Sequence, residues 1–364
     1  MAIVKQDIRT LSLDELTTFI EQHGEKKFRA KQVMEWLWKK SATSFDQMNN
    51  IGKGLQQLLT DHFEFSFAKL ADKQVSSDGT VKCAFKVDED KVVEGVLIPT
   101  KSRMTACISS QVGCSLACKF CATGRLKMLR NLTAGEIYDQ VAFLKNDAEA
   151  LYKIPLSNIV YMGMGEPLLN YKNVLSSIEK ITSPEGLGMS PQRITVSTAG
   201  IAKMIKKLGD DKVKFNLALS LHAANDEKRN KIMDINETNS LSVLSEALRY
   251  FHDKTGTRIT IEYIIFKEFN DSIKDAHELA DYCRSFPVKI NIIEYNPIDD
   301  GEYKQADPDR VNAFAAFLES RNLIVNVRRS RGKDIDAACG QLANKNAVGK
   351  AKRKIEDAAP QDSE

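Results

Sequence analysis

Residues 114–121 read CSLACKFC and place Cys114, Cys118 and Cys121 in a C-x3-C-x2-C pattern. The first residues of the chain lack the apolar run of a signal peptide, so such close thiols indicate a metal centre rather than a disulfide framework. A structural zinc ion would need a fourth protein ligand. Iron–sulfur clusters are held by thiolates, and three thiolates leave one iron of a four-iron cluster open. The stretch therefore predicts an iron–sulfur site, with a zinc knuckle or three chance cysteines as alternatives.

The bulk composition is that of a soluble globular protein, with 43% apolar and 28% charged residues in a chain of 364. This length is ample for a barrel-sized catalytic domain and a small accessory domain. No apolar run approaches the roughly 20 residues of a membrane span, so we expect no membrane association. The seven cysteines are odd in number and locally clustered. That usage fits a reducing cytoplasm.

Basic residues gather near both ends of the chain, although the net charge is only +3. Such clusters usually form solvated faces, so charge alone leaves RNA contact open. The clusters are Lys26, Lys27, Arg29, Lys31, Lys39 and Lys40, then Arg328, Arg329, Arg331 and Lys333, and finally Lys350, Lys352, Arg353 and Lys354.

The first hundred residues change from a helical to a strand pattern. Residues 1–65 are expected to form a helical accessory domain, and Ser12 with Glu15 is typical of a capping box at a helix start. Residues 66–100 are expected to form a β-hairpin linker, with strands at 82–87 and 91–99 after the turn signal at 77–79.

Residues 101–330 alternate strand-like and helix-like segments, which is typical of a parallel sheet. About six such units predict an α/β fold, a partial (β/α)6 barrel, and no dinucleotide fingerprint follows the first strand. A short C-terminal segment at 331–345 would follow the barrel, and 346–364 would be a disordered tail. The expected strands are 104–109, 158–162, 193–197, 215–221, 258–265, 289–295 and 323–328.

Polar motifs follow several of these strands, and barrel chemistry collects at the carboxyl ends of strands. The run GMGEP at 163–167 has glycines that allow close backbone approach and Glu166, which can accept a hydrogen bond from an ammonium group. Ser197, Ser220 and Asn296 suit ribose and carboxylate groups, although such residues also cap helices. His222 is as consistent with a structural histidine as with a ligand contact.

Two further cysteines stand out by their positions. Cys107 ends the first barrel strand, and Cys339 lies among small residues, as expected of a thiol that must be exposed and move. A thiolate can accept a methyl group from a sulfonium, and a second thiol can release what the first sulfur carries by closing a disulfide. Cys83 and Cys283 lie in apolar alternating contexts, which predicts core positions.

Taken together, these motifs resemble the radical SAM RNA methyltransferases, and within them the enzymes that methylate C2 of adenosine. The resemblance rests on the cysteine triad and on the runs at 109–114, 130–133, 163–170, 220–223, 296–297 and 334–342. It implies a [4Fe-4S] cluster on the triad, Cys339 as methyl acceptor, Cys107 as its disulfide partner and Glu94 as proton acceptor. The strand pattern alone predicts that Glu94 is exposed. The implied contacts to S-adenosylmethionine (SAM) are Gly165, Glu166, Ser197, Ser220, Leu221, His222 and Asn296.

The reaction that the resemblance implies uses two SAM molecules. The first would methylate Cys339, and the second would give a deoxyadenosyl radical that takes hydrogen from this methyl group. The resulting radical would add to C2 of an adenine, after which loss of the C2 proton and attack by Cys107 would free 2-methyladenosine. The implied substrates are 23S rRNA in its peptidyl-transferase region and tRNAs beside the anticodon, where splayed bases are accessible.

The resemblance also implies a reducing partner such as flavodoxin or ferredoxin, a cytoplasmic location and a monomeric chain. Three other functions remain open. The sister enzyme that methylates C8 of the same adenosine shares the cysteines. A zinc-dependent RNA-binding protein without catalysis would explain the triad alone. A glycyl-radical activating enzyme would need the triad but not Cys339.

Overall fold

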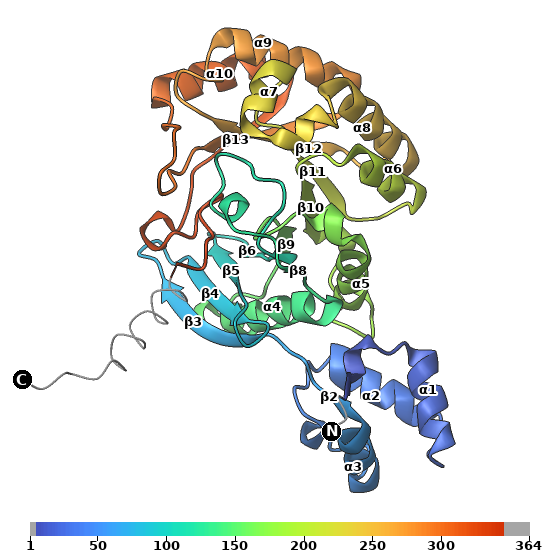
Figure 1. The fold of residues 1–364 in the computed structure, drawn as a ribbon. Helices are drawn as coiled ribbons and strands as arrows, with labels where there is room; N and C mark the ends of the chain where they lie inside the picture. The colour runs from blue at the N-terminus through green and yellow to red at the C-terminus, as the bar shows by residue number, and fades with distance from the viewer. Residues whose placement is uncertain (1–4, 346–364) are drawn as a thin grey trace, which may run out of the picture.

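A mixed sheet of ten strands forms the body of the protein in the computed structural model, which describes residues 5–345 (Figure 1). Seven strands are parallel and follow one another across the sheet in chain order. All seven predicted strands are present, within two residues of their expected bounds. They are β6 (Met104–Cys107), β9 (Asn158–Tyr161), β10 (Ile194–Thr198), β11 (Asn216–Ser220), β12 (Ile259–Ile265), β13 (Val288–Glu294) and β14 (Ile324–Arg328).

Helices connect the parallel strands and cover the outer face of the sheet (Figure 1). In the described part of the chain β14 and β3 are the two edges of the sheet and do not pair. The barrel is therefore open along one side, and the predicted α/β partial barrel is confirmed. The connecting helices are α4 (Ala134–Asp147), α5 (Tyr171–Thr182), α6 (Ala202–Asp210), α7 (Asp226–Ile232), α8 (Leu241–Thr255), α9 (Ile273–Tyr282) and α10 (Pro308–Ser320).

Residues 66–100 differ from the expected linker. They form three antiparallel strands, β3 (Lys69–Val75), β4 (Val81–Lys86) and β5 (Val92–Pro99), and β5 pairs with β6 of the barrel. The predicted hairpin is β4–β5, but it extends the barrel sheet instead of joining two separate units. The reason is burial: the first five residues of β4 are all buried, so its backbone needs strand partners on both sides.

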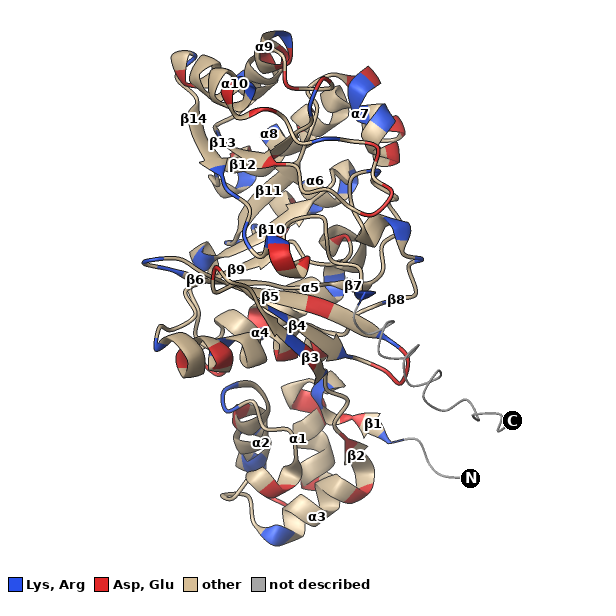
Figure 2. Ribbon diagram, turned by 90° about the vertical axis from the view of Figure 1, so that its left-hand side faces the viewer, with Lys and Arg blue, Asp and Glu red and all other residues tan. Residues whose placement is uncertain are grey.

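The N-terminal unit consists of α1 (Leu13–Gln22), α2 (Phe28–Trp38) and α3 (Lys53–His62), with the short parallel pair β1 (Gln6–Asp7) and β2 (Phe63–Glu64). The capping box that Ser12 and Glu15 predicted is present at the start of α1. Figure 2 shows this unit packed against the side of the sheet that carries α4.

A buried polar joint holds the N-terminal unit to α4. Nη1 of Arg9 lies 2.6 Å from Oδ1 of Asp139, with 4% and 14% of the two side chains exposed. The Tyr138 hydroxyl donates to the backbone oxygen of Trp38. Because these groups are withdrawn from water, the unit is fixed relative to the barrel.

The predicted tail at 346–364 lies outside the described residues. Within residues 5–345 no helix has the length and hydropathy required to cross a lipid bilayer.

Candidate active site

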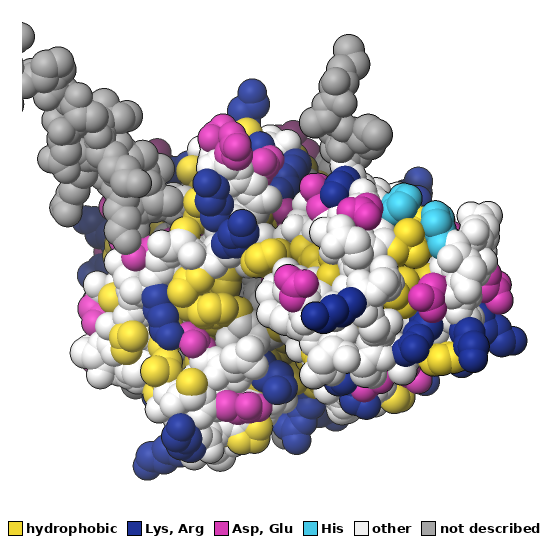
Figure 3. All heavy atoms as spheres, turned by 90° about the horizontal axis from the view of Figure 1, so that it is seen from below, with side chains coloured by type: hydrophobic (Ala, Val, Ile, Leu, Met, Phe, Trp, Pro, Cys, Tyr) yellow, Lys and Arg dark blue, Asp and Glu magenta, His cyan; other side chains and the backbone are white. Residues whose placement is uncertain are grey.

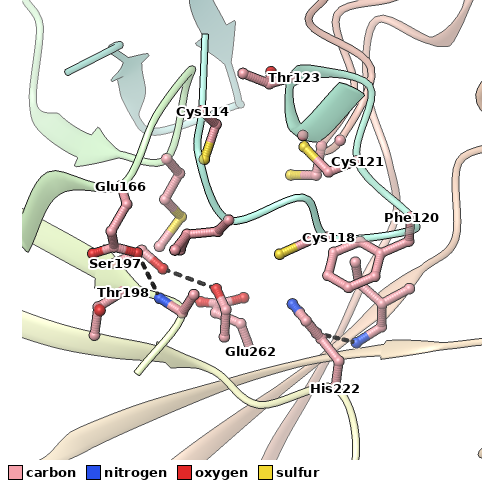
Figure 4. Close-up of a pocket in the computed structure, with 18 of the residues that line it drawn as sticks. Cys114, Cys118, Phe120, Cys121, Thr123, Glu166, Ser197, Thr198, His222 and Glu262 are labelled. Carbon is pink, nitrogen blue, oxygen red and sulfur yellow. Dashed lines mark hydrogen bonds between the residues drawn. The ribbon is translucent and has the colours of Figure 1, made fainter. Parts of the chain in front are cut away.

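A cavity of about 160 Å³ lies at the carboxyl ends of the parallel strands (Figure 4). Most of the site residues expected from the sequence line it, although they come from five separate segments of the chain. These residues are Cys114, Cys118, Cys121, Gly165, Glu166, Ser197, Ser220, His222 and Cys339.

The cysteine loop begins after β6 and is closed at its base by two short antiparallel strands, β7 (Gln111–Val112) and β8 (Arg130–Asn131). Gly113, at φ +79°, permits this closure, because a Cβ there would lie 2.2 Å from the backbone oxygen of Lys127. Farther along the loop the backbone N–H of Lys119 donates to the oxygen of Ile232, at 3.0 Å. The loop is thus held at its base and at its middle.

The three thiols of the loop all point into the cavity (Figure 4). Burial raises the pKa of Cys114 to about 11, and it also raises the pKa values of Cys118 and Cys121. Coordination to a metal centre offsets this cost, because metal ligands are thiolates. Within residues 5–345 no three His, Cys, Asp or Glu side chains surround a single metal position. Three thiols that line one cavity fit a four-iron cluster, in which each sulfur binds a different iron.

Glu166 is a buried carboxylate without a cationic partner in the described residues. Its Oε1 accepts from the N–H of Leu168 at 3.0 Å, and its Oε2 accepts from the N–H of Ala199 at 2.8 Å. Burial raises the pKa of Glu166 to about 7, against these hydrogen bonds. An ammonium group entering the cavity would supply the missing positive charge. The site therefore fits the amino group of SAM.

The glycines before Glu166 allow two backbone segments to touch. A Cβ on Gly163 would lie 2.6 Å from Oγ of Ser109. Gly165 has φ +96°, and a Cβ on it would lie 2.5 Å from Cβ of Gln111. The GMGEP run thus packs directly on the strand that leads into the cysteine loop.

Ser197, Ser220 and His222 form the wall opposite the cysteine loop. The two serine hydroxyls are 3.2 Å apart. Nδ1 of His222 accepts from the N–H of Ile264 at 3.1 Å, and its ring meets that of Phe120 edge-on at 4.7 Å. Burial and then the charge of Arg229 lower the pKa of His222 to about 3. The imidazole is therefore neutral, and its Nε2–H is left as a donor.

Two expected SAM contacts do not line this cavity. The Leu221 side chain is fully buried, and its N–H donates to the oxygen of Glu262 at 3.0 Å. Nδ2 of Asn296 donates to the backbone oxygen of Cys339 at 3.2 Å, while its buried Oδ1 has no partner among residues 5–345. Asn296 thus supports the Cys339 segment and keeps one acceptor free.

A second cavity of about 650 Å³ fills the inside of the open barrel. Cys107 lines this cavity, and Cys339 borders both cavities. Burial, and then the neighbouring Cys339, raise the pKa of Cys107 to about 12. The residue Cys339 is exposed, as expected from its small neighbours; partial loss of water around its thiol raises its pKa, and the Arg328 guanidinium opposes this effect. The structure thus brings the two cysteines to one boundary, although they are 232 positions apart in the sequence.

Glu94 lies on β5 and is only 2% exposed, contrary to the strand pattern. Its Oε2 accepts from the N–H groups of Ala343 and Asn344 at 2.9 and 3.1 Å. Its Oε1 lies 3.6 Å from Nζ of the buried Lys82. Glu94 therefore holds the chain just beyond Cys339, behind the wall of the larger cavity.

Sequence reasoning missed the pair Glu262 and Arg328, which lines both cavities beside Cys339. Oε2 of Glu262 lies 3.4 Å from Nη1 of Arg328, and its Oε1 accepts from Nδ2 of Asn291 at 2.8 Å. Glu262 is the single charged residue in the apolar strand ITIEYII, and that exception was the available signal. In the sequence, Arg328 belongs to the basic cluster near the C-terminus, a pattern that predicts a solvated face. Cys83 and Cys283, predicted as core, are buried.

The chain matches two described families. Residues 108–280 match the radical SAM superfamily, and residues 6–65 match the ribosomal RNA large subunit methyltransferase N-terminal domain. A crystal structure of a radical SAM methyltransferase from Sphaerobacter thermophilus superposes with a TM-score of 0.87 and 35% identity, covering 93% of this chain and 99% of that one. The open barrel and its cysteine loop are therefore those of a radical SAM enzyme.

Curated relatives give the narrower family. "Probable dual-specificity RNA methyltransferase RlmN" of Cytophaga hutchinsonii is 59% identical, with 94% of each chain covered. "Dual-specificity RNA methyltransferase RlmN" of Geobacter sulfurreducens is 42% identical, with 93% of this chain and 92% of that one covered. The chain belongs to the RlmN family of radical SAM RNA methyltransferases. Membership implies SAM and a [4Fe-4S] cluster as cofactors.

Proposed function

We propose that the protein methylates C2 of an adenosine, in the peptidyl-transferase region of 23S rRNA and beside the anticodon of tRNAs. One observation carries the proposal: Cys339 borders both the cavity of the cysteine triad and the larger cavity that contains Cys107. A methyl group on its sulfur would face the cofactor side and the substrate side at once. This placement supports a route through a methylated cysteine and a transient disulfide.

The cofactors would occupy the smaller cavity, with the cluster on Cys114, Cys118 and Cys121. Bound together, the cluster and SAM supply a methyl group and a radical from one-electron cleavage. Glu166 would accept from the ammonium group, and the Nε2–H of His222 would donate to the ligand. The full SAM-binding set is Gly165, Glu166, Ser197, Ser220, Leu221, His222 and Asn296, with Leu221 and Asn296 acting from behind the cavity wall.

Cys339 and Cys107 would carry the chemistry of the protein itself. The Cys339 thiolate is the nucleophile that accepts a methyl group, and the neighbouring Arg328 favours its charged form. C2 of adenine is an electron-poor carbon and not a nucleophile, so it would not accept a methyl group from SAM by polar transfer. A radical formed on the methyl group of Cys339 would add to it. Once the adduct has lost the C2 proton and one electron, which the bound cluster would accept, the Cys107 thiolate attacks the Cys339 sulfur. The S–S bond forms, the sulfur–carbon bond breaks, and the carbon keeps the bonding pair and takes a proton, which completes the methyl group of the product.

Glu94 would take the proton that leaves C2. In the structure its Oε2 holds two backbone N–H groups of the C-terminal segment. That segment must therefore shift before the carboxylate can accept a proton, which links proton removal to the position of Cys339.

The N-terminal unit offers a surface for RNA. Phe28 is 47% exposed, and the Arg29 guanidinium lies 5.0 Å from the centre of its ring. Nζ of Lys40 lies 3.9 Å from the ring centre of Trp36. Figure 3 shows cationic side chains beside hydrophobic ones on the lower face. Aromatic rings flanked by cations suit stacking on unpaired bases.

We further propose that the protein is a monomer in the cytoplasm and that flavodoxin or ferredoxin reduces its cluster.

The test is anaerobic reconstitution with SAM, a reductant and either an rRNA fragment or tRNA, followed by mass spectrometry of the nucleosides. We expect a brown protein and 2-methyladenosine. 8-Methyladenosine as the main product would assign the protein to the C8 reaction, and a colourless zinc protein without product would contradict catalysis. Cys339→Ala should give no product, whereas the matched control Cys283→Ala, at a buried core position, should retain turnover.

A further inference from the structure

Arg229 is a fully buried arginine without an ion pair among the residues that the structure describes. It lies on α7, behind the wall that carries Ser220 and His222. Burial lowers its pKa to about 10, so the guanidinium stays protonated at neutral pH. The nearby carboxylate of Asp226 is separated from it by Asn236, which accepts from Arg229 at 2.7 Å and donates to Asp226 at 2.8 Å. A buried charge that meets only neutral acceptors is costly unless an opposite charge faces it.

The donors of Arg229 fix the ends of two neighbouring strands. Its Nη2 donates to the backbone oxygens of Ala199 and Ser220, at 2.5 and 3.3 Å, and its Nε donates to that of Leu221, at 3.1 Å. The N–H of Ala199 in turn donates to Glu166. The backbone of Ala199 thus links the Arg229 guanidinium to the Glu166 carboxylate through two hydrogen bonds.

The positive charge of Arg229 acts on groups on the cavity side of this wall. Helix α7, which carries Arg229, contacts the cysteine loop, because the N–H of Lys119, next to Cys118, donates to the oxygen of Ile232 at 3.0 Å. The charge of Arg229 also lowers the pKa of His222. Three thiolates and a cluster would place net negative charge there. The opposite charge that the arginine lacks in the protein alone would therefore come with the cofactor.

We propose that Arg229 is the internal counter-charge of the cluster and the positioning residue of the SAM wall. This inference rests on the proposed cofactor site but not on the RNA product. A fixed positive charge favours the reduced, more negative cluster, because net charge near a cluster sets its reduction potential. Loss of the charge should make the cluster harder to reduce, and loss of the hydrogen bonds should weaken SAM binding.

The experiment measures the midpoint potential of the reconstituted full chain by EPR-monitored redox titration, and SAM affinity by calorimetry. Arg229→Met should shift the potential to a more negative value and weaken SAM binding, and Arg229→Lys should keep the potential near that of the wild type. Lys231→Gln is the matched control, because it removes an exposed cation from the same helix. The midpoint potential of the cluster in the Lys231→Gln variant should equal that of the wild type.

A second variant keeps the arginine and tests the proposed counter-charge even if Arg229→Met does not fold. The double change Asp226→Asn with Asn236→Asp moves one carboxylate into contact with the guanidinium at constant total charge. It should shift the potential in the same negative direction. Unchanged potentials in the folded variants, even with weaker SAM binding, would reduce Arg229 to a structural role and overturn the proposal. Product formation on RNA is scored separately, so its failure does not affect this result.

Discussion

Replacing Glu94 by glutamine is expected to release the segment that carries Cys339. The carboxylate is 2% exposed, accepts from the N–H groups of Ala343 and Asn344, and lies 3.6 Å from the buried ammonium of Lys82. Glutamine has nearly the same shape but no charge. It therefore leaves Lys82 as an unpaired buried cation and turns both charge-assisted hydrogen bonds into neutral ones.

The expected loss in the free energy of unfolding is about 5 kcal/mol. Breaking a buried ion pair costs about 3–5 kcal/mol, and the lower end applies because 3.6 Å is a long contact. The two weakened hydrogen bonds add roughly 1 kcal/mol each. Since domains are stable by about 5–15 kcal/mol, the loss is easily measured. Lys82→Met in the Glu94→Gln background should recover most of it, because the unpaired charge is removed.

Urea unfolding gives the stability, and hydrogen exchange at residues 343–344 with alkylation of Cys339 reports release of the segment. The two weakened hydrogen bonds, about 2 kcal/mol of local stability, correspond to roughly thirtyfold faster exchange. Glu89→Gln, an exposed carboxylate in the turn after β4, is the matched control. If Glu94→Gln unfolds at the wild-type urea concentration and residues 343–344 remain protected, Glu94 does not hold the segment.

Three further predictions concern the cavity. Cys107→Ala should stall the reaction with RNA joined covalently to Cys339, visible as a shifted band on a denaturing gel; free product at the normal rate would contradict the disulfide step. SAM affinity measured by calorimetry should rise with pH through about 7, because burial raises the pKa of Glu166 to about 7 and only its charged form attracts an ammonium group. Glu166→Gln should remove this dependence. Gly165→Ala should lower the unfolding temperature, since φ +96° costs a side chain about 1–2 kcal/mol and its Cβ would meet Gln111; an unchanged temperature would refute this.

The sequence predicted those features that depend on short-range pattern. The apolar runs of the barrel strands, the loop of the cysteine triad and the position of Cys107 at a strand end all follow from neighbouring residues. Burial of Glu94 could not be predicted in this way. Its cover comes from residues 343–344, 249 and 250 positions away, and from the pairing of β5 with the barrel.

Arg229 shows the same limit. It lies in the helix DEKRNKI, whose composition predicts a solvated surface, yet it is fully buried. Its partners are strand-end carbonyls that only the parallel sheet brings together. Short-range pattern gives the type of element, whereas the environment of a charged side chain is set by which distant backbone groups the topology places beside it.

The position of Cys339 is set by the hydrogen bonds of its segment, residues 339–343. Three hydrogen bonds beside Cys339 use backbone groups of its segment and do not involve the thiol. On one side the N–H of Ala122, next to Cys121, donates to the oxygen of Gly340 at 2.7 Å. On the other side Asn296 holds the oxygen of Cys339 at 3.2 Å, and Glu94 holds the following residues. Because one tie ends in the cysteine loop, a shift of Cys339 toward the larger cavity must also strain or break a contact of the loop that holds the cluster. The geometry thereby couples the position of the methyl carrier to the cofactor site.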